Sequence, residues 1–74
     1  MVDYKPIVPQ RLKYWREKHD VKQEDIATYL KIKQSSYANY EAGKRLPDIN
    51  RIFQIADFYS TTVDKLLGRT DIEQ

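Results

Sequence analysis

The stretch from Gln23 to Glu41 constrains this chain most, because it holds two short helical patterns with almost no loop between them. Apolar residues recur at helical spacing in both halves. They are Ile26, Ala27 and Leu30 in the first half, Ile32 in the turn, and Tyr37 and Tyr40 in the second half. Two helices joined by a turn of three or four residues are the usual geometry for laying one helix in the major groove of DNA. The stretch therefore predicts a pair of DNA-binding helices.

The second helix of this pair presents polar side chains between its apolar positions. These side chains are short and both donate and accept hydrogen bonds: Gln34, Ser35, Ser36 and Asn39. A glutamine or an asparagine can pair with adenine through two hydrogen bonds, which contributes about 1–3 kcal/mol of discrimination, whereas a serine specifies less. No arginine lies on this face, so strong reading of guanine is not expected unless Lys33 supplies a positive charge. The alternative is that the four side chains only form a solvated helix surface.

Lys22 and Lys33 occupy the positions at which the second and third helices begin. Ser, Thr, Asn or Asp would cap a helix there, contributing about 1 kcal/mol, and a cation also opposes the helix dipole. Two explanations stay open. Either packing alone stabilises both helices, or both lysines face DNA phosphates, where positive charge is favourable.

Three segments are expected along the chain. Residues 1–8 contain Pro6 and no helical pattern, which predicts an extended N-terminal arm. Residues 9–68 form one compact helix-turn-helix domain, because helical patterns follow one another without a linker. Residues 69–74 are a polar C-terminal tail.

The first helix of the domain is expected from Pro9 to about His19. Proline suits the first turn of a helix, where its missing N–H costs nothing. Leu12 and Trp15 mark the buried face of this helix. Asp20 follows at a place that often needs a left-handed residue, a conformation that Asp tolerates better than most other non-glycine residues.

The second half of the chain predicts two further helices. Gly43 ends the third helix in a left-handed conformation, Asp48 and Thr62 serve as N-caps, and Gly68 ends the last helix. The residues expected on the inner face of the fourth helix are Ile49, Ile52, Phe53, Ala56 and Tyr59, and the fifth helix is expected to contain Val63, Leu66 and Leu67. No segment shows two-residue alternation, so the fold class is all-α, a compact bundle of five short helices.

Composition excludes several classes of protein. With 74 residues the chain is one small domain, and with no cysteine it has neither disulfides nor thiolate metal sites. No apolar run approaches the roughly 20 residues of a membrane span, and the N-terminus lacks the order of a secretory signal, so a cytoplasmic protein is expected. The single histidine, His19, has no nucleophile near it in the pattern. No metal-ligand spacing or glycine-rich phosphate loop occurs, so neither an enzyme nor a cofactor is expected.

Charge is unevenly distributed along the chain. Residues 1–45 carry ten basic and six acidic residues, whereas residues 46–74 carry three basic and five acidic residues. A basic N-terminal part and an acidic C-terminal part suit a protein that turns one face toward phosphates. A merely solvated charged surface remains the alternative.

Taken together, four segments give the chain a specific resemblance. The segments are RLKYWRE, QEDIA, SSYANYEAGKRLPD and IADFYSTTVDKLLG, in this order between Pro9 and Gly68. The chain resembles the helix-turn-helix domain of the phage repressor and Cro family, which includes single-domain regulators of the xenobiotic-response-element type. It departs from the family at Lys31, where glycine is usual, and at Tyr37, where a smaller or β-branched residue is commoner. A left-handed Lys31 would cost roughly 1 kcal/mol.

The resemblance implies roles for individual residues. Gln34, Ser35, Ser36 and Asn39 match positions that face base edges. Gln23 matches a residue that touches the DNA backbone, and Lys44 and Arg45 match a loop that grips phosphate. Arg16 and Glu41 match a partly buried ion pair between the first and third helices.

These features predict a sequence-specific DNA-binding transcriptional regulator of the repressor kind. The helix over about 34–41 is expected to enter the major groove of double-stranded DNA, in a homodimer on a palindromic site. Candidates for the dimer surface are Leu46, Phe58 and Leu67. No membrane and no small-molecule effector is expected. The alternative is an antitoxin-like or adaptor protein whose main partner is another protein.

Overall fold

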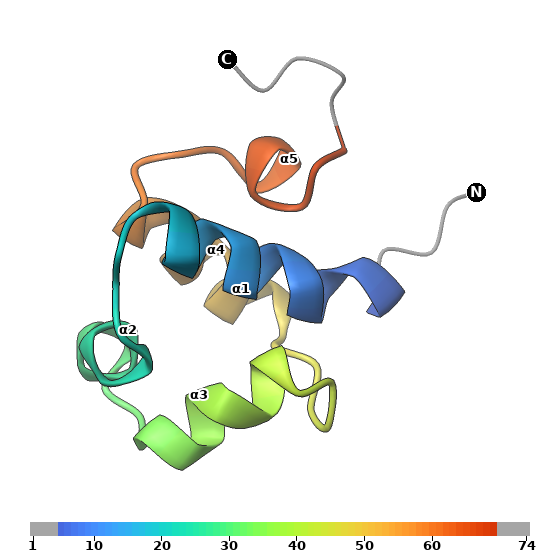
Figure 1. Ribbon diagram of the computed structural model, residues 1–74. Helices are drawn as coiled ribbons and strands as arrows, with labels where there is room; N and C mark the ends of the chain where they lie inside the picture. The colour runs from blue at the N-terminus through green and yellow to red at the C-terminus, as the bar shows by residue number, and fades with distance from the viewer. Residues whose placement is uncertain (1–4, 70–74) are drawn as a thin grey trace.

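The computed structural model describes residues 5–69, and every regular element in this range is helical (Figure 1). A short 3-10 helix, η1 (Lys5–Ile7), leads directly into the first α-helix. The five α-helices are α1 (Val8–Lys18), α2 (Gln23–Leu30), α3 (Gln34–Glu41), α4 (Ile49–Phe58) and α5 (Val63–Leu66). The predicted all-α fold with five short helices is confirmed.

The prediction of an extended arm over residues 1–8 is wrong for residues 5–8. Val8, Leu12 and Trp15 recur at helical spacing, so the pattern of α1 begins one residue before Pro9. Val8 is fully buried, which contributes about 1.5–3 kcal/mol and favours helix over an extended arm. Pro9 lies in the first turn, where its missing N–H is harmless. Residues 1–4 of the expected arm and 70–74 of the expected tail lie outside the described residues.

One hydrophobic core joins all five α-helices. Its buried residues are Val8, Leu12, Trp15, Ile26, Ala27, Leu30, Tyr37, Tyr40, Ile52, Ile55, Ala56, Tyr59, Leu66 and Leu67. α3 packs against α1 and α2, while α4 packs against α2 and α5. Figure 1 shows α3 on one side of α1 and α5 on the other. The core therefore holds α3 at an edge of the domain, with its outer face free of other helices.

The buried face of α4 differs from the predicted one. Ile52, Ala56 and Tyr59 are buried as expected, but Ile49 and Phe53 are more than half exposed, and Ile55 is buried instead. α4 is apolar around more than half of its circumference, so its sequence pattern does not decide which flank faces the core.

Among residues 5–69, three non-glycine residues adopt left-handed backbone conformations directly after helices. They are Asp20, Lys31 and Ser60, with φ of 55°, 61° and 54°. The prediction for Asp20 is confirmed, as is that for Gly43, which has φ of 76° after α3. Lys31 is the C-cap of α2, and its backbone N–H donates to Thr28 O at 3.1 Å. The turn before α3 therefore needs a conformation that lysine adopts only at a cost.

Replacing Lys31 with glycine is expected to stabilise the domain by about 0.5 kcal/mol. Relief of the left-handed conformation is worth about 1–2 kcal/mol, while the greater freedom of glycine in the unfolded chain offsets about 0.5–1 kcal/mol. Urea unfolding measures the difference. Lys44→Gly is the matched control, because Lys44 is also an exposed loop lysine but has no positive φ, so this variant should lose stability. Equal effects in both variants would contradict the strain at Lys31.

Candidate nucleic-acid interface

A turn of three residues joins α2 to α3. The N–H of Ile32 donates to Ala27 O at 3.0 Å, which closes the end of α2, and the Ile32 side chain packs against the core. α3 then begins at Gln34. Figure 1 views α2 almost along its axis and α3 from the side, so the two helices cross at a large angle. The turn thus directs α3 across the edge of the domain.

One face of α3 is buried and the opposite face is open. Tyr37 is fully buried and Tyr40 is nearly so, as predicted. Successive helical residues are about 100° apart, so Ser35 and Asn39 lie opposite these tyrosines and Gln34 lies at the edge of the same open face. Gln34 and Ser35 are exposed and Asn39 is half-buried. The structure therefore brings together three of the four residues expected to read bases.

Ser36 does not belong to this open face. The same angular spacing places it on the flank beside Tyr40, and it is half-buried. Ala38 lies on the open face between Gln34 and Ser35, and polarity alone did not single it out. Its methyl group is suited to contact the methyl of thymine. Helical spacing was the signal that could have found it, because Ala38 follows Gln34 by four residues.

Gln23 connects the start of α3 to its end. Gln34 Nε2 donates to Gln23 Oε1 at 3.4 Å, and Gln23 Nε2 donates to Glu41 Oε1 at 3.2 Å. A carboxylate only accepts hydrogen bonds, so the amide nitrogen of Gln23 must face Glu41 and its oxygen faces Gln34. This chain of hydrogen bonds orients Gln34 at the N-terminal end of the open face.

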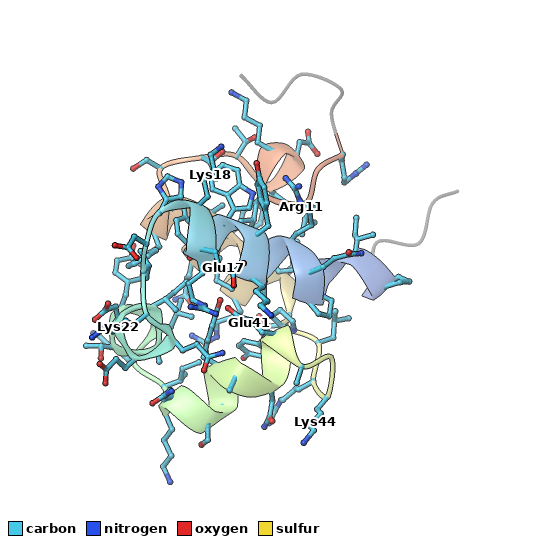
Figure 2. All side chains as sticks on the ribbon, in the orientation of Figure 1. Arg11, Glu17, Lys18, Lys22, Glu41 and Lys44 are labelled. Carbon is cyan, nitrogen blue, oxygen red and sulfur yellow. The ribbon has the colours of Figure 1, made fainter. Side chains whose placement is uncertain are left out.

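Glu41 and Arg16 form the ion pair that links α3 to α1. Arg16 Nε donates to Glu41 Oε2 at 2.7 Å and Arg16 Nη2 donates to Oε1 at 3.1 Å, while Arg16 Nη1 donates to Val21 O at 3.1 Å. The Tyr37 hydroxyl also donates to Glu41 Oε2, at 2.6 Å. Figure 2 shows Glu41 between α1 and α3. Because the Glu41 side chain is only 6% exposed, this pair anchors the C-terminal end of α3 in the interior.

The network shifts the pKa values of its members. Burial by itself would raise the pKa of the Glu41 carboxyl, but hydrogen bonds from Arg16, Tyr37 and Gln23 outweigh burial and hold this pKa below its ordinary value. The hydrogen bond to Glu41 raises the pKa of Arg16. Burial, and then the hydrogen bond to Glu41, raise the pKa of Tyr37. Burial raises the pKa of Tyr59 to about 12, with a contribution from the charge of Glu41. All four groups keep their neutral-pH charge states firmly.

Acid is expected to remove the stabilisation that Glu41 contributes. Its pKa is depressed in the folded state, so the contribution is fully present above the unfolded pKa of about 4.3 and is lost as pH falls through the folded pKa. Glu41→Gln has no such titration. Urea unfolding of both proteins should therefore show a stability difference at pH 7 that shrinks steadily below pH of about 4. A difference that stays constant down to pH of about 2 would contradict this assignment.

Cations flank α3 at both ends. Lys22, Lys33, Lys44 and Arg45 are all exposed. Lys33 precedes α3 and makes no side-chain cap, and the first turn of α3 contains no acidic residue. Figure 2 shows Lys22 near one end of α3 and Lys44 near the other. At the start of α2, Asp25 Oδ2 accepts a hydrogen bond from the N–H of Lys22 at 3.2 Å, while the Lys22 ammonium, which can only donate, caps no helix N–H.

The sequence pattern of the helix-turn-helix family matches residues 12–66. The chain belongs to the helix-turn-helix family. It is 39% identical over 64 residues to the HTH-type transcriptional regulator AnsR of Bacillus subtilis, covering 86% of this chain and 55% of AnsR. It is 37% identical over 62 residues to the uncharacterized HTH-type transcriptional regulator YobD of the same organism, covering 84% of this chain and 55% of YobD. The resemblance to regulators of the phage repressor and Cro type is thereby confirmed.

The relatives differ in length from this helix-turn-helix chain. The chain spans about half the length of AnsR and YobD. By contrast, the uncharacterized HTH-type transcriptional regulator MJ0272 of Methanocaldococcus jannaschii is 32% identical over 63 residues, which cover 85% of this chain and 96% of MJ0272. No solved structure matches the chain. The shared region is therefore the helix-turn-helix domain itself.

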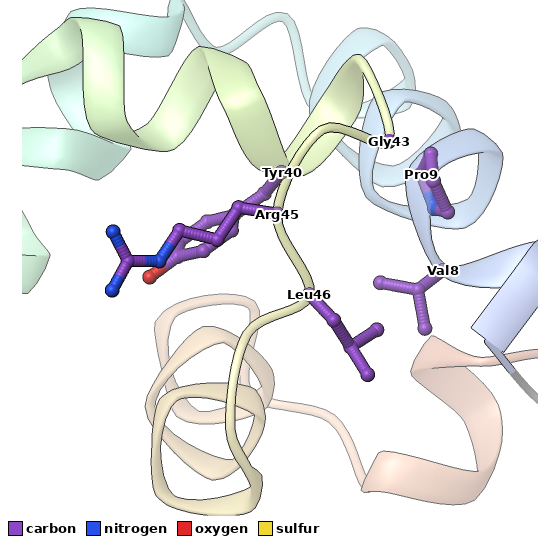
Figure 3. A pocket seen from close by; sticks show the side chains of 6 residues that line it. All are labelled: Val8, Pro9, Tyr40, Gly43, Arg45 and Leu46. Carbon is purple, nitrogen blue, oxygen red and sulfur yellow. The ribbon is translucent and has the colours of Figure 1, made fainter.

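A small pocket lies beside the loop that follows α3 in this helix-turn-helix domain (Figure 3). Its volume is about 140 Å³, and its lining residues are Val8, Pro9, Tyr40, Gly43, Arg45 and Leu46. Small-molecule sites usually measure about 300–1,000 Å³. This pocket has the size of a side chain rather than that of an effector.

One of the three residues expected at a dimer surface is buried. Leu67 is 3% exposed, so its assignment to the surface is wrong. α5 is a single turn that packs against both α1 and α4, which places Leu66 and Leu67 together in the core. Leu46 is 41% exposed, and Phe58 is half-buried with its ring 5.0 Å from that of Tyr29.

Among residues 5–69, no helix combines the length and the apolar character that crossing a membrane needs. In the same range, no three His, Asp or Glu side chains gather as metal ligands would. His19 stacks on Trp15 with ring centroids 5.4 Å apart.

Proposed function

We propose that this chain is a sequence-specific DNA-binding transcriptional regulator that places α3 in the major groove of double-stranded DNA. The observation that carries this proposal is the open polar face of α3 with exposed cations at both of its ends. A single helix of this width fits the major groove, where each base pair presents a distinct set of hydrogen-bond partners. The relatives named as transcriptional regulators support the same function.

The residues of the interface divide into two groups in this proposal. Gln34 and Asn39 read bases through their amide groups, Ser35 adds a weaker contact, and Ala38 packs against a thymine methyl. The phosphate contacts come from Lys22, Gln23, Lys33, Lys44 and Arg45. Contacts of the first kind specify the site, while those of the second position the protein on the duplex. Ser36, on the flank of the helix, is assigned to neither group.

We also propose that the protein acts as a homodimeric repressor in the cytoplasm, without enzymatic activity and without a small-molecule effector. One unit of this kind reads only a few base pairs, and two-fold pairing on half-sites about 34 Å apart supplies the missing affinity. A dimer seated on a promoter excludes other proteins from it, which is the simplest way in which a domain of this size represses.

Selection of binding sites from random duplex DNA tests the function. The expected result is a palindrome. Four exposed cations in each of two copies predict an affinity that falls on the order of 10⁴-fold between 50 and 200 mM salt. Weak, sequence-blind binding would contradict the proposal and favour an antitoxin-like or adaptor protein, whose partner a pull-down would then identify.

A matched pair of variants localises the phosphate contacts. Lys44→Gln should weaken binding to all sequences alike and reduce the salt slope by about one for each copy of the chain. Lys18→Gln is the control, because Figure 2 shows Lys18 on the opposite side of α1 from α3. Lys18 lies over the rings of Tyr14 and Trp15. Equal salt slopes in the two variants would remove the loop after α3 from the interface.

A further inference from the structure

Arg51 reaches from α4 to the C-terminal end of α2. Its Nη1 atom donates to the carbonyl oxygen of Leu30 at 3.1 Å, and Leu30 is the last residue of α2. The last carbonyls of a helix have no partner within the helix, and among residues 5–69 no backbone N–H donates to this one. Leu30 is almost fully buried, so its carbonyl needs a donor from the protein. Arg51 supplies that donor.

The Arg51 side chain is itself held in position. The same Nη1 atom donates to Gln54 Oε1 at 2.9 Å, one turn further along α4. The backbone N–H of Arg51 donates to Oδ1 of Asp48, the N-cap of α4, at 2.8 Å. A cation at the C-terminal end of α2 also suits the dipole of that helix. The start of α4 is therefore built to present one charged donor to the end of α2.

The hydrogen bond from Arg51 lies on the peptide unit that enters the turn between α2 and α3. A peptide unit is planar, so its carbonyl oxygen and its N–H rotate together. In the unit between Leu30 and Lys31, Arg51 binds the oxygen and the N–H donates to Thr28 O at 3.1 Å. Both sides of this peptide unit are thus fixed by hydrogen bonds.

Lys31 lies between this peptide unit and the next one, which is fixed as well. The N–H of Ile32 belongs to the second unit and donates to Ala27 O at 3.0 Å. The rotation between the two units is the left-handed conformation of Lys31, with φ of 61°, which lysine adopts only at a cost and glycine adopts freely. Of the three hydrogen bonds that hold the two units, the one from Arg51 comes from outside α2 and the turn. It is the bond through which α4 acts on the turn.

We propose that Arg51 is a positioning residue for α3, which acts through the left-handed turn at Lys31. Glu41 anchors the C-terminal end of α3 to α1, while the turn sets the direction in which the N-terminal end leaves α2. Without Arg51, the peptide unit before Lys31 rotates toward the right-handed conformations that lysine prefers, and Gln34 moves with the start of α3. The proposal deepens the proposed function, in which Gln34 reads a base, and its effect on DNA binding rests on that function.

Arg51→Met tests the effect on DNA binding, because it keeps the apolar stem and removes the donor. Binding to the selected site should weaken about fivefold, which corresponds to a turn correctly placed in about one fifth of the molecules, since the apparent Kd is the intrinsic Kd divided by that fraction. Arg11→Met is the matched control. Arg11 donates to Leu66 O at 3.1 Å and to Lys65 O at 3.0 Å, so it also binds carbonyls at the end of a helix, but that helix is α5. This control loses the same charge and should keep an affinity close to that of the wild type.

Lys31→Gly separates positioning from a loss of stability alone. Glycine adopts the left-handed conformation without the cost, so the turn should keep its direction even without Arg51. In the Lys31→Gly background, the effect of Arg51→Met on affinity should therefore fall below about twofold. All affinities are measured at a temperature at which each variant is folded. An equal loss of affinity in both backgrounds would overturn the proposal.

Arg51→Lys is the conservative variant. One nitrogen atom makes both hydrogen bonds of the Arg51 side chain, and an ammonium has three donors, so lysine can replace it here. The affinity of Arg51→Lys for the selected site should therefore stay closer to that of the wild type than to that of Arg51→Met. A loss as large as that of Arg51→Met would contradict the hydrogen bond to Leu30 as the cause.

The orientation of α3 relative to α2 can be measured without DNA, through residual dipolar couplings of the backbone N–H groups. Arg51→Met should change the couplings of α3, whereas Arg11→Met should leave them as in the wild type. Unchanged couplings in Arg51→Met would overturn the proposal whatever the DNA result. Should Arg51→Met fail to fold, Gln54→Ala removes the acceptor that orients Arg51, at an exposed position. Unchanged couplings in Gln54→Ala would then be the contrary result.

The two kinds of measurement separate this proposal from the proposed function. If the wild type shows no sequence-selective binding to DNA, the proposed function fails, and the dipolar couplings still decide whether Arg51 positions α3. If the wild type binds the selected site, and Arg51→Met binds it as tightly as Arg11→Met does, the positioning role of Arg51 fails while the proposed function stands.

Discussion

Replacing Arg16 with alanine is expected to lower the free energy of unfolding by about 3 kcal/mol, a large part of the stability of so small a domain. Glu41 would remain almost fully buried with its negative charge, and only Tyr37 and Gln23 would still donate to it. The carbonyl of Val21 would also lose its donor. Thermal and urea unfolding measure the loss. DNA affinity, measured at a temperature where the variant is folded, should fall as well, because Glu41 anchors one end of α3.

Two companion variants show whether the buried charge is the cause. Adding Glu41→Gln to Arg16→Ala removes the unpaired charge, so the double variant should be more stable than Arg16→Ala alone. Arg69→Ala is the matched control, because Arg69 forms a 3.6 Å ion pair with Asp64 in which both side chains are more than half exposed. Exposed pairs of this kind contribute little, so no measurable loss is expected. Equal losses in Arg16→Ala and Arg69→Ala would contradict the role of burial.

Local chemistry made the helix boundaries predictable. The side chains of Asp48 and Thr62 accept hydrogen bonds from the N–H groups of Arg51 and Lys65, as N-caps do. Gly43 has the left-handed conformation expected after α3. Each of these signals depends on a few neighbouring residues, so a single sequence displays it. α2 and α3 accordingly begin where the pattern placed them, at Gln23 and Gln34.

Side-chain burial was less predictable, because it depends on which helices pack together. Ile49 and Phe53 have the same apolar character as Ile52 and Ile55, yet the packing of α4 in the shared core buries the second pair and leaves the first exposed. Val8 is a second example. Its spacing to Leu12 is helical, but that it belongs to α1 becomes clear only from its burial in the core. The predictions of an inner face containing Ile49 and Phe53 and of an arm containing Val8 were wrong for this reason.

The candidate site combines both kinds of information. The burial of Tyr37 and Tyr40 in α3 was predictable from their spacing. Because these two side chains face the core, the residues on the other side of the helix are the ones that face solvent. The hydrogen bond from Gln34 to Gln23 spans 11 residues of sequence, and that from Gln23 to Glu41 spans 18. Separations of this kind leave no periodic signal. The sequence therefore identified the polar residues of α3, but not their angular positions or the network that orients Gln34.

The largest effect on DNA recognition is expected from replacing Gln34 and Asn39 together with alanine. Each amide that pairs with an adenine contributes about 1–3 kcal/mol of discrimination, so the double variant should bind the selected site at least about 30-fold more weakly. Alanine favours helix, and the backbone oxygen of Asn39, which accepts from Lys44 and Arg45, remains in place. Binding to unrelated DNA should change little, because the phosphate contacts are untouched. Titrations of both DNAs at one salt concentration measure the ratio.

Ser36→Ala is the control that tests the angular assignment of α3. Ser36 is polar and lies between the proposed base-reading residues in sequence, but the helix places it on the flank beside Tyr40. Its loss should therefore leave both titrations unchanged. If Ser36→Ala weakened specific binding as much as Gln34→Ala/Asn39→Ala, the helix would have to enter the groove rotated toward that flank. Ala38 would then no longer face the bases, so this comparison decides which side of α3 carries the specificity.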